Sequence, residues 1–186
     1  MFKGTSASAG IGIGKAVIVE EAELVITRNE VADAEAEIQR FKGALEKTIA
    51  ATQKMADDLA SRVGEKEAEI MQGHMMLLSD PMLTGEIENS VKNDKVNCEF
   101  AIENVCNMYA DMFASMGDEL MQQRATDMRD IKVRMQRTLM GLESVDVSLL
   151  PKGSILVAND LTPSMTAGIN PENVSGIVTE LGGKTS

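Results

Sequence analysis

The sequence predicts a two-part α+β protein, in which a helical bundle is inserted into an α/β domain built from both ends of the chain. Short β-branched runs alternate with glycine-rich turns at both ends of the 186 residues. Between these ends, from about Glu30 to Gly141, glycine is rare and Ala, Glu, Lys, Gln, Leu and Met dominate, which is typical of helices. We therefore expect parts at 1–27, 28–143 and 144–186.

The first part, 1–27, predicts two strands. The glycine-rich run GIGIG at 10–14 precedes the β-branched segment Lys15–Val19. After an acidic turn, Leu24-Val25-Ile26 predicts a second strand. The third part, 144–186, predicts further strands at Ser154–Ala158 and at 176–179, the first of which follows a Pro-Lys-Gly turn.

The middle part predicts antiparallel helices. Apolar residues at spacings of three and four from Val31 to Val63 predict a long amphipathic helix that ends at Gly64. Short connections between long helices imply antiparallel neighbours, and hence a bundle. The other predicted helices span 65–78, 82–94, 97–116 and 118–140, and the last two are expected to turn Met112, Met116 and Leu120 inward.

Charge and composition exclude several classes of protein. The 29 acidic against 18 basic residues give a formal net charge of −11, and no basic patch interrupts the acidic sequence. Such a surface repels phosphate backbones and anionic membranes, so we expect a basic protein partner, no nucleic acid and no membrane insertion. Cys98 and Cys106 lie too far apart along one helix to pair, so free thiols and a cytoplasmic location are expected.

Two glycine-rich motifs, the single histidine and the methionines are the candidates for chemistry or binding. The glycines at 10–14 break the dinucleotide-loop spacing, and Gly183-Lys184-Thr185 lacks the first glycine of a P-loop. His74, the single histidine, has no cysteine or acid cluster at ligand spacing beside it, so a helix-surface histidine or a partner contact is favoured over catalysis. Of the 14 methionines, most are expected in the core, whereas Met75, Met76 and Met82 flank a helix break and could form an interface.

Five segments carry a family resemblance as an ordered set. They are GTSASAGIGIGKA at 4–16, GHMMLLSDP at 73–81, RATDMRDI at 124–131, ILVANDLTPSMTA at 155–167 and GGKTS at 182–186. In this order they resemble the N-terminal half of enzyme I of the bacterial phosphotransferase system. The LTPS and GGxTS pieces alone are shared with pyruvate phosphate dikinase and phosphoenolpyruvate synthase.

The resemblance implies a swivelling phosphohistidine α/β domain, here partial, interrupted by a helical domain that docks the small phosphocarrier HPr. The full-length enzyme transfers phosphoryl from phosphoenolpyruvate to its own histidine and on to HPr for sugar uptake. A C-terminal barrel, which is absent from this sequence, binds phosphoenolpyruvate and magnesium and drives homodimerisation. For the present chain we therefore expect no cofactor and no metal site, a monomer, and HPr docking as its activity.

The resemblance also assigns residues. The acceptor histidine follows GGxTS in the family and would come directly after Ser186, so no catalytic residue is expected within the chain. A phosphoimidazole is labile enough to pass its group to a second histidine. The residues expected to support that histidine are Thr166, Lys184, Thr185 and Ser186. Those expected to bind HPr are Glu65, Glu69, His74, Met76, Leu77, Asp80 and Arg124, with Met76 and Leu77 as apolar anchors and the acids steering a basic carrier.

Two alternatives stay open at this point. The chain could be the swivelling domain of an enzyme that resembles pyruvate phosphate dikinase, with pyruvate chemistry in place of HPr. It could also be a non-catalytic helical adaptor. A histidine encoded directly after Ser186 would favour the phosphoryl relay over the adaptor.

Overall fold

The computed structural model describes residues 4–142 and 144–182, which form two compact units. A helical unit spans Glu23–Ser144, and an α/β unit combines Met1–Ala22 with Val145–Ser186. The fold is thus a helical bundle together with α/β elements contributed by both ends of the chain. No helix in the described ranges is both long and apolar enough to cross a lipid bilayer.

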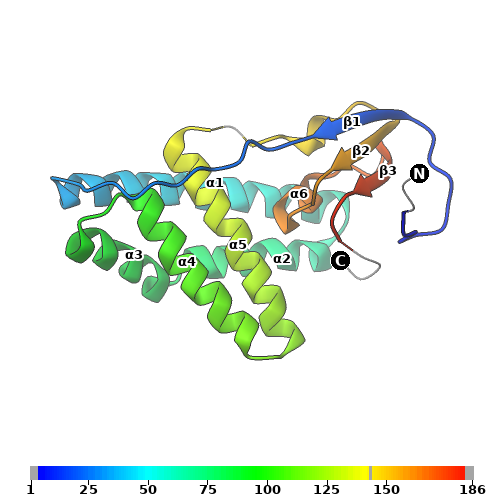
Figure 1. The fold of residues 1–186 in the computed structure, drawn as a ribbon. Helices are drawn as coiled ribbons and strands as arrows, with labels where there is room; N and C mark the ends of the chain where they lie inside the picture. The colour runs from blue at the N-terminus through cyan, green and yellow to red at the C-terminus, as the bar shows by residue number, and fades with distance from the viewer. Residues whose placement is uncertain (1–3, 143, 183–186) are drawn as a thin grey trace. The chain divides into compact units, whose positions relative to one another are not determined.

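The α/β unit contains a parallel sheet of three strands in the order β1-β2-β3 (Figure 1). Its strands are β1 (Lys15–Val19), β2 (Ser154–Ala158) and β3 (Val174–Thr179), and the helix α6 (Pro163–Gly168) connects the second to the third. A 3₁₀ turn, η1 (Val147–Leu149), precedes β2. Parallel pairing requires such a crossover between strands. The small core consists of Val19, Val147, Leu150 and Leu156.

The glycine-rich run before β1 serves close backbone packing. A Cβ on Gly14 would overlap the carbonyl oxygen of Gly153, and one on Gly12 would overlap that of Ser175. Lys15 N–H then donates to the same Gly153 carbonyl at 3.1 Å, which starts the β1–β2 pairing. These two glycines therefore let β1 enter the sheet, a structural role that needs no phosphate ligand.

The strand expected at 24–26 is wrong. These residues have no regular structure, and Val25 is 74% exposed. The chain pairs a few residues later instead, where Val31 N–H donates to Lys95 O at 2.9 Å and Asn97 N–H donates to Asn29 O at 3.0 Å. A strand needs a partner with free backbone groups, and in the described chain 24–26 has none.

The helical unit contains five helices whose bounds follow local signals. They are α1 (Ala34–Arg62), α2 (Glu65–Leu78), α3 (Pro81–Asp94), α4 (Cys98–Ser115) and α5 (Glu119–Met140). Asp33 caps α1 by accepting from Ala36 N–H at 3.0 Å, and Gly141, at φ 66°, ends α5 in the left-handed conformation. Proline at the start of α3 has no N–H to satisfy there.

One large apolar cluster holds α1 and α3–α5 together and includes the last residue of α2. Its buried members are Ile38, Phe41, Leu78, Leu83, Ile87, Val91, Val96, Cys98, Ala101, Ile102, Val105, Cys106, Ala110, Ala125, Met128, Ile131 and Met135. Both cysteines are free and buried, and burial raises the pKa of each thiol to about 12.

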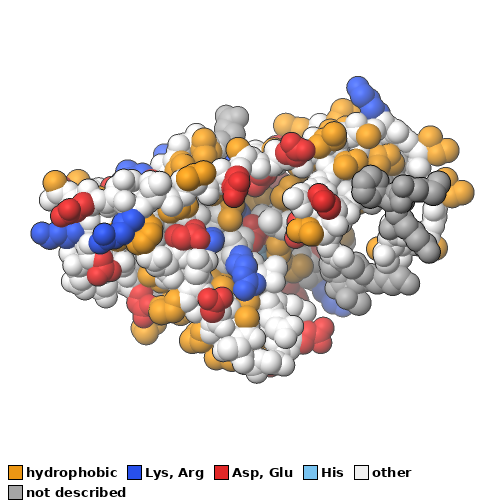
Figure 2. Space-filling view, viewed as in Figure 1, with side chains coloured by type: hydrophobic (Ala, Val, Ile, Leu, Met, Phe, Trp, Pro, Cys, Tyr) orange, Lys and Arg blue, Asp and Glu red, His pale blue; other side chains and the backbone are white. Residues whose placement is uncertain are grey.

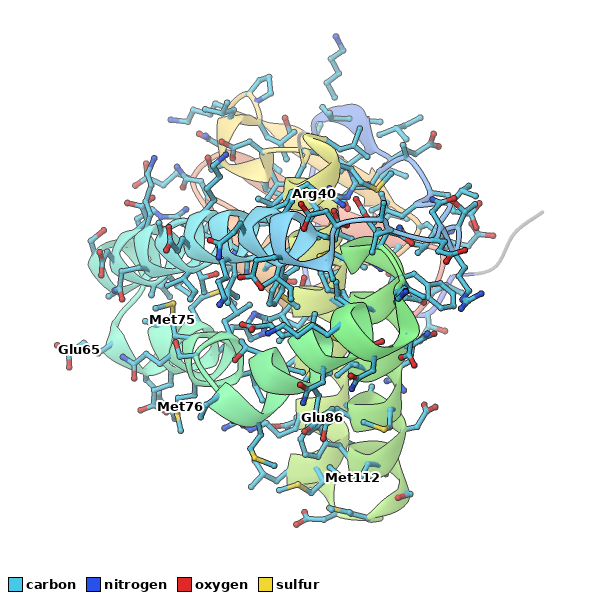
Figure 3. All side chains as sticks on the ribbon, turned by 90° about the vertical axis from the view of Figure 1, so that its left-hand side faces the viewer. Arg40, Glu65, Met75, Met76, Glu86 and Met112 are labelled. Carbon is cyan, nitrogen blue, oxygen red and sulfur yellow. The ribbon has the colours of Figure 1, made fainter. Side chains whose placement is uncertain are left out.

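The prediction that Met112, Met116 and Leu120 point inward is wrong, because all three side chains are exposed. Met112 and Met116 lie near the end of α4, and Leu120 lies near the start of α5. This end of the α4–α5 hairpin extends past α2 and α3 (Figures 1 and 3). Helical periodicity predicts a face, but it does not tell how far a neighbouring helix covers that face.

Candidate functional site

The residues expected to bind a partner lie on α2, on the turn after it and on α5, all within the helical unit. Glu65 and Glu69 are exposed on α2, and Met76 is 71% exposed near its end. Seven residues make about two helical turns, so Glu69 and Met76 share one side of α2, and Asp80 follows in the turn beyond the helix. Figure 3 shows the Met76 side chain pointing away from the bundle, whereas Met75 lies between α1 and α2.

Leu77 and Asp80 are less available than Met76 for contact with a partner protein. Leu77 is half-buried and packs against the apolar cluster, so it contributes to the fold as well as to the surface. The Asp80 carboxylate caps α3 by accepting from Met82 N–H at 2.8 Å. One carboxylate oxygen is therefore already engaged, although the negative charge remains half-exposed at the surface.

His74 is buried, which corrects the expectation of a helix-surface histidine. Its side chain is 0% exposed, and its Nε2 lies 3.2 Å from Asp127 Oδ1 on α5. Nδ1 lies 4.0 Å from Asp130 Oδ2. The side of α2 that carries His74 packs against α5, so the imidazole does not reach the surface. In this structure His74 is not placed to contact a partner directly.

Arg124 is brought to α2 by packing against a glycine. A Cβ on Gly73 would lie 2.6 Å from Arg124 Nη1, so a larger residue at 73 would push the guanidinium away. Arg124 Nη1 also lies 3.6 Å from Asp127 Oδ2, and the Arg124 side chain keeps 32% exposure. Gly73 itself lies one helical turn before the exposed Met76 on α2.

Three residues outside the sequence-based assignment extend this surface. Figure 3 shows Glu86 of α3 and Met112 of α4 in the lower half of the view, as is Met76. Burial and then the charges of Glu86 and Asp80 raise the pKa of Tyr109 on α4. We name Met76, Met82, Glu86 and Met112, with the α2 acids Glu65 and Glu69, the methionine surface. Met82 flanks the helix break that the sequence predicts. No sequence feature near Glu86 indicates that it belongs to an interface.

Of the residues expected to support a phosphohistidine, the structure describes Thr166, which lies in the α/β unit. Thr166 is exposed on α6, and its hydroxyl donates to Thr162 O at 3.0 Å, which leaves its oxygen lone pairs free to accept. Lys184, Thr185 and Ser186 lie outside the described residues. Within the described part of the chain, no group of three or more His, Cys, Asp or Glu side chains could hold a metal ion.

Comparison with known proteins agrees with this arrangement of elements. Residues 3–124 match the family model described as "PEP-utilising enzyme, N-terminal", and residues 150–186 match "PEP-utilising enzyme, mobile domain". A solution structure of Enzyme I (nEIt) superposes with a TM-score of 0.89 at 37% identity, and the alignment covers 100% of this chain and 76% of that one. The chain belongs to the Enzyme I family of PEP-utilising enzymes.

Other members of the Enzyme I family are similar over the whole chain. The present chain is 39% identical to the phosphoenolpyruvate-protein phosphotransferase of Bacillus subtilis and 41% identical to that of Listeria monocytogenes. In both alignments the chain spans 32% of the relative's length. A structure titled "N-terminal domain of Enzyme 1 - Nitrogen" matches with a TM-score of 0.69 at 25% identity, over 98% of this chain and 75% of that one.

Proposed function

We propose that this chain is the N-terminal part of a phosphoenolpyruvate-protein phosphotransferase and that its helical unit docks the phosphocarrier HPr through the methionine surface. The α/β unit would carry the phosphohistidine on a residue that follows the GGKTS segment. Family membership and the presence of the mobile-domain match at 150–186 support this proposal. The full-length reaction is phosphoryl transfer from phosphoenolpyruvate to that histidine and then to HPr.

The observation that carries the docking proposal is an apolar centre surrounded by acids. Met76 and Met82 are 71% and 65% exposed, and the thioether side chain adapts readily to a partner surface. Glu65 and Glu69 are exposed on the same helix as Met76, and Glu86 contributes a further acid from α3. Depletion of charge at the centre with charges around it is the usual anatomy of a protein interface. A carrier with basic residues around its own histidine would complement this surface.

Thr166 gives the α/β unit its proposed part in the reaction. A hydroxyl whose hydrogen already donates to Thr162 O can accept a hydrogen bond from an imidazole N–H. Such a contact would fix the tautomer and leave the other ring nitrogen free to attack phosphorus. Lys184, Thr185 and Ser186, which lie outside the described residues, would support the same histidine.

Phosphoenolpyruvate and magnesium are assigned, in this proposal, to the part of the relatives that lies beyond the matched third. The present chain would need neither to dock HPr. We further propose that the chain is a monomer, that the full-length enzyme is a homodimer, and that both act in the cytoplasm.

The test is titration of the chain with purified HPr, followed by amide NMR shifts at two salt concentrations. Docking at the methionine surface predicts shifts centred on 65–82 and near Arg124, with binding that weakens as salt rises because exposed charges are screened. Met76→Ala is expected to raise Kd about tenfold, a typical cost for an interface anchor. Met140→Ala, at a partly exposed methionine near the far end of α5, is the matched control and should leave Kd unchanged.

Two outcomes would contradict the docking proposal. Absence of binding at millimolar HPr would favour a dikinase-like or adaptor role for the helical unit. Binding with shifts confined to the α/β unit would move the docking site away from the methionine surface. Either result is independent of whether the full-length protein transfers phosphoryl groups.

A further inference from the structure

Arg124 packs closely against Gly73, and the other ionisable residues assigned to HPr docking are, apart from His74, acids. Its guanidinium lies over Gly73, with Nη1, Cζ and Nη2 at 2.6, 3.6 and 3.8 Å from where a Cβ would stand. Only glycine at 73 leaves room for a cation packed this closely on α2. Along α2 the guanidinium therefore lies between Glu69, one turn before Gly73, and Met76, one turn after it.

The Arg124 guanidinium is also held by Asp127, whose carboxylate pairs with the buried His74. Asp127 Oδ2 lies 3.6 Å from Arg124 Nη1, and Asp127 Oδ1 lies 3.2 Å from His74 Nε2. His74 is fully buried, so its ring is fixed by packing and in turn fixes the carboxylate. The Asp127 side chain is only 15% exposed, which limits the screening of its attraction for the guanidinium.

We infer that Gly73, His74 and Asp127 form a socket that pre-orients Arg124 to bind a hydrogen-bond acceptor of the docked carrier, a carboxylate or a main-chain carbonyl. This inference rests on the proposed docking function. The guanidinium has five N–H donors and no acceptor, and it remains 32% exposed, so donors are left for a partner. Gly73, His74 and Asp127 are positioning residues, and Arg124 makes the contact.

A fixed cation on an acidic surface determines orientation. The acids attract a basic carrier in many poses, but Arg124 repels any pose that brings a Lys or Arg of the carrier onto it. The pose with an acceptor opposite Arg124 is thereby selected. Because the side chain is already ordered by the socket, less conformational entropy is lost when the contact forms.

The variant Gly73→Ala is expected to displace Arg124 without destabilising the fold. The added methyl meets only the far end of a flexible side chain, so Arg124 moves while α2 gains a better helix former. The matched control is Gly43→Ala on α1, where a new Cβ meets nothing within 4 Å. Both variants are expected to fold with stability equal to or above that of the parent chain.

The experiment is a double-mutant cycle on HPr affinity, measured by calorimetry with the whole chain. Arg124→Ala is expected to raise Kd about tenfold and Gly73→Ala about fivefold, as expected for loss of a charge-assisted contact and of its pre-organisation. In the Arg124→Ala background, Gly73→Ala should have no further effect on Kd. Gly43→Ala should leave Kd unchanged in either background.

A spectroscopic measurement checks the socket directly. The Nε–Hε resonance of Arg124 is expected to shift in Gly73→Ala and in Asp127→Asn, because both change the surroundings of the guanidinium, and to stay in place in Gly43→Ala. Arg124→Lys keeps the charge but loses the planar fork, so it should recover only part of the affinity lost in Arg124→Ala.

The outcomes distinguish this inference from the function on which it rests. If the parent chain does not bind HPr, the proposed docking function fails. If the parent binds but Arg124→Ala binds equally well, docking stands and the inference is overturned. Equal effects of Gly73→Ala with and without Arg124 would also overturn it, because Gly73 would then act independently of the cation.

Discussion

The helical unit and the α/β unit bury apolar residues to very different extents. Five helices enclose one continuous cluster that includes Phe41, Ile102 and Met135. In the described part of the α/β unit, the apolar cluster has four buried members, Val19, Val147, Leu150 and Leu156, while Ile18, Ile177 and Val178 on the strands remain exposed. Parallel sheets are normally covered on both faces, so the α/β unit has the weaker core.

This difference in core size affects how the two proposed roles, HPr docking and support of the phosphohistidine, can be tested. The methionine surface is carried by a unit with a large core of its own, so its geometry can be tested with the chain as it stands. Thr166 belongs to a short helix over a small core, where position depends on few contacts. Local stability should therefore separate the docking unit from the phosphohistidine unit.

Removing a large core side chain should affect the helical unit most. Phe41 is 1% exposed in the large cluster, and Phe41→Ala is expected to lower the free energy of unfolding by about 3–5 kcal/mol. Leu156→Ala should lower the stability of the sheet alone, nearer about 2 kcal/mol, because the small core around it can collapse. Urea unfolding followed by helical circular dichroism and by NMR signals of the strands measures both. A loss of strand signals in Phe41→Ala equal to that of helix signals would contradict two separable units.

Hydrogen exchange should reveal the same difference without mutation. Amides of α4, around Ile102 and Cys106, are expected to exchange about a hundredfold more slowly than those of β2. The helical amides need the opening of the large cluster, whereas the strands open at lower cost. Exchange read residue by residue by NMR measures this ratio. Uniform protection across both units would show that they unfold together.

Local signals in the sequence predicted most element bounds, and remote contacts account for the errors. Pro81 and Gly141 act within one turn, so the start of α3 and the end of α5 could be placed from sequence. The cap Asp33 was not singled out, and α1 begins at Ala34 and not at Val31. The strand expected at 24–26 failed because pairing is decided by a distant segment. His74 was placed at the surface because the carboxylate that receives it, Asp127, lies 53 residues away. The packing of Arg124 against Gly73 could not be predicted either, because the two residues lie far apart in the sequence.

Glycine substitutions should have opposite signs in the two units. Gly14→Ala would place a Cβ against the backbone carbonyl of Gly153, which cannot rotate away, so a loss of about 1–3 kcal/mol is expected in the α/β unit. Gly43→Ala lies in open space within α1 and should stabilise the helical unit by about 1 kcal/mol. Thermal unfolding of the two variants side by side gives both changes. A neutral Gly14→Ala would show that the glycine-rich run is not needed for close packing.

The smallest expected effect is a pH dependence specific to the helical unit. The Glu37 carboxylate accepts from Arg40 Nη2 at 2.7 Å and from Cys98 N–H at 2.8 Å, joining α1 to the start of α4. The hydrogen bond from Arg40 lowers the pKa of Glu37, although burial opposes it. A lowered pKa adds stability above the ordinary glutamate range, and this stability is lost as the pH falls through the pKa of the folded state.

Glu37→Gln should therefore cost less than about 1 kcal/mol at pH 7, as partly exposed ion pairs usually do. It should also make the helical transition less sensitive to acid, since the carboxylate that must be protonated is gone. Glu46→Gln, at an exposed carboxylate on the same helix, is the control and should leave the acid slope unchanged. Urea midpoints measured from pH 7 down to pH 3 test this. If Glu37→Gln shifted the strand signals instead of the helical ones, this network would be tied to the other unit and the comparison would fail.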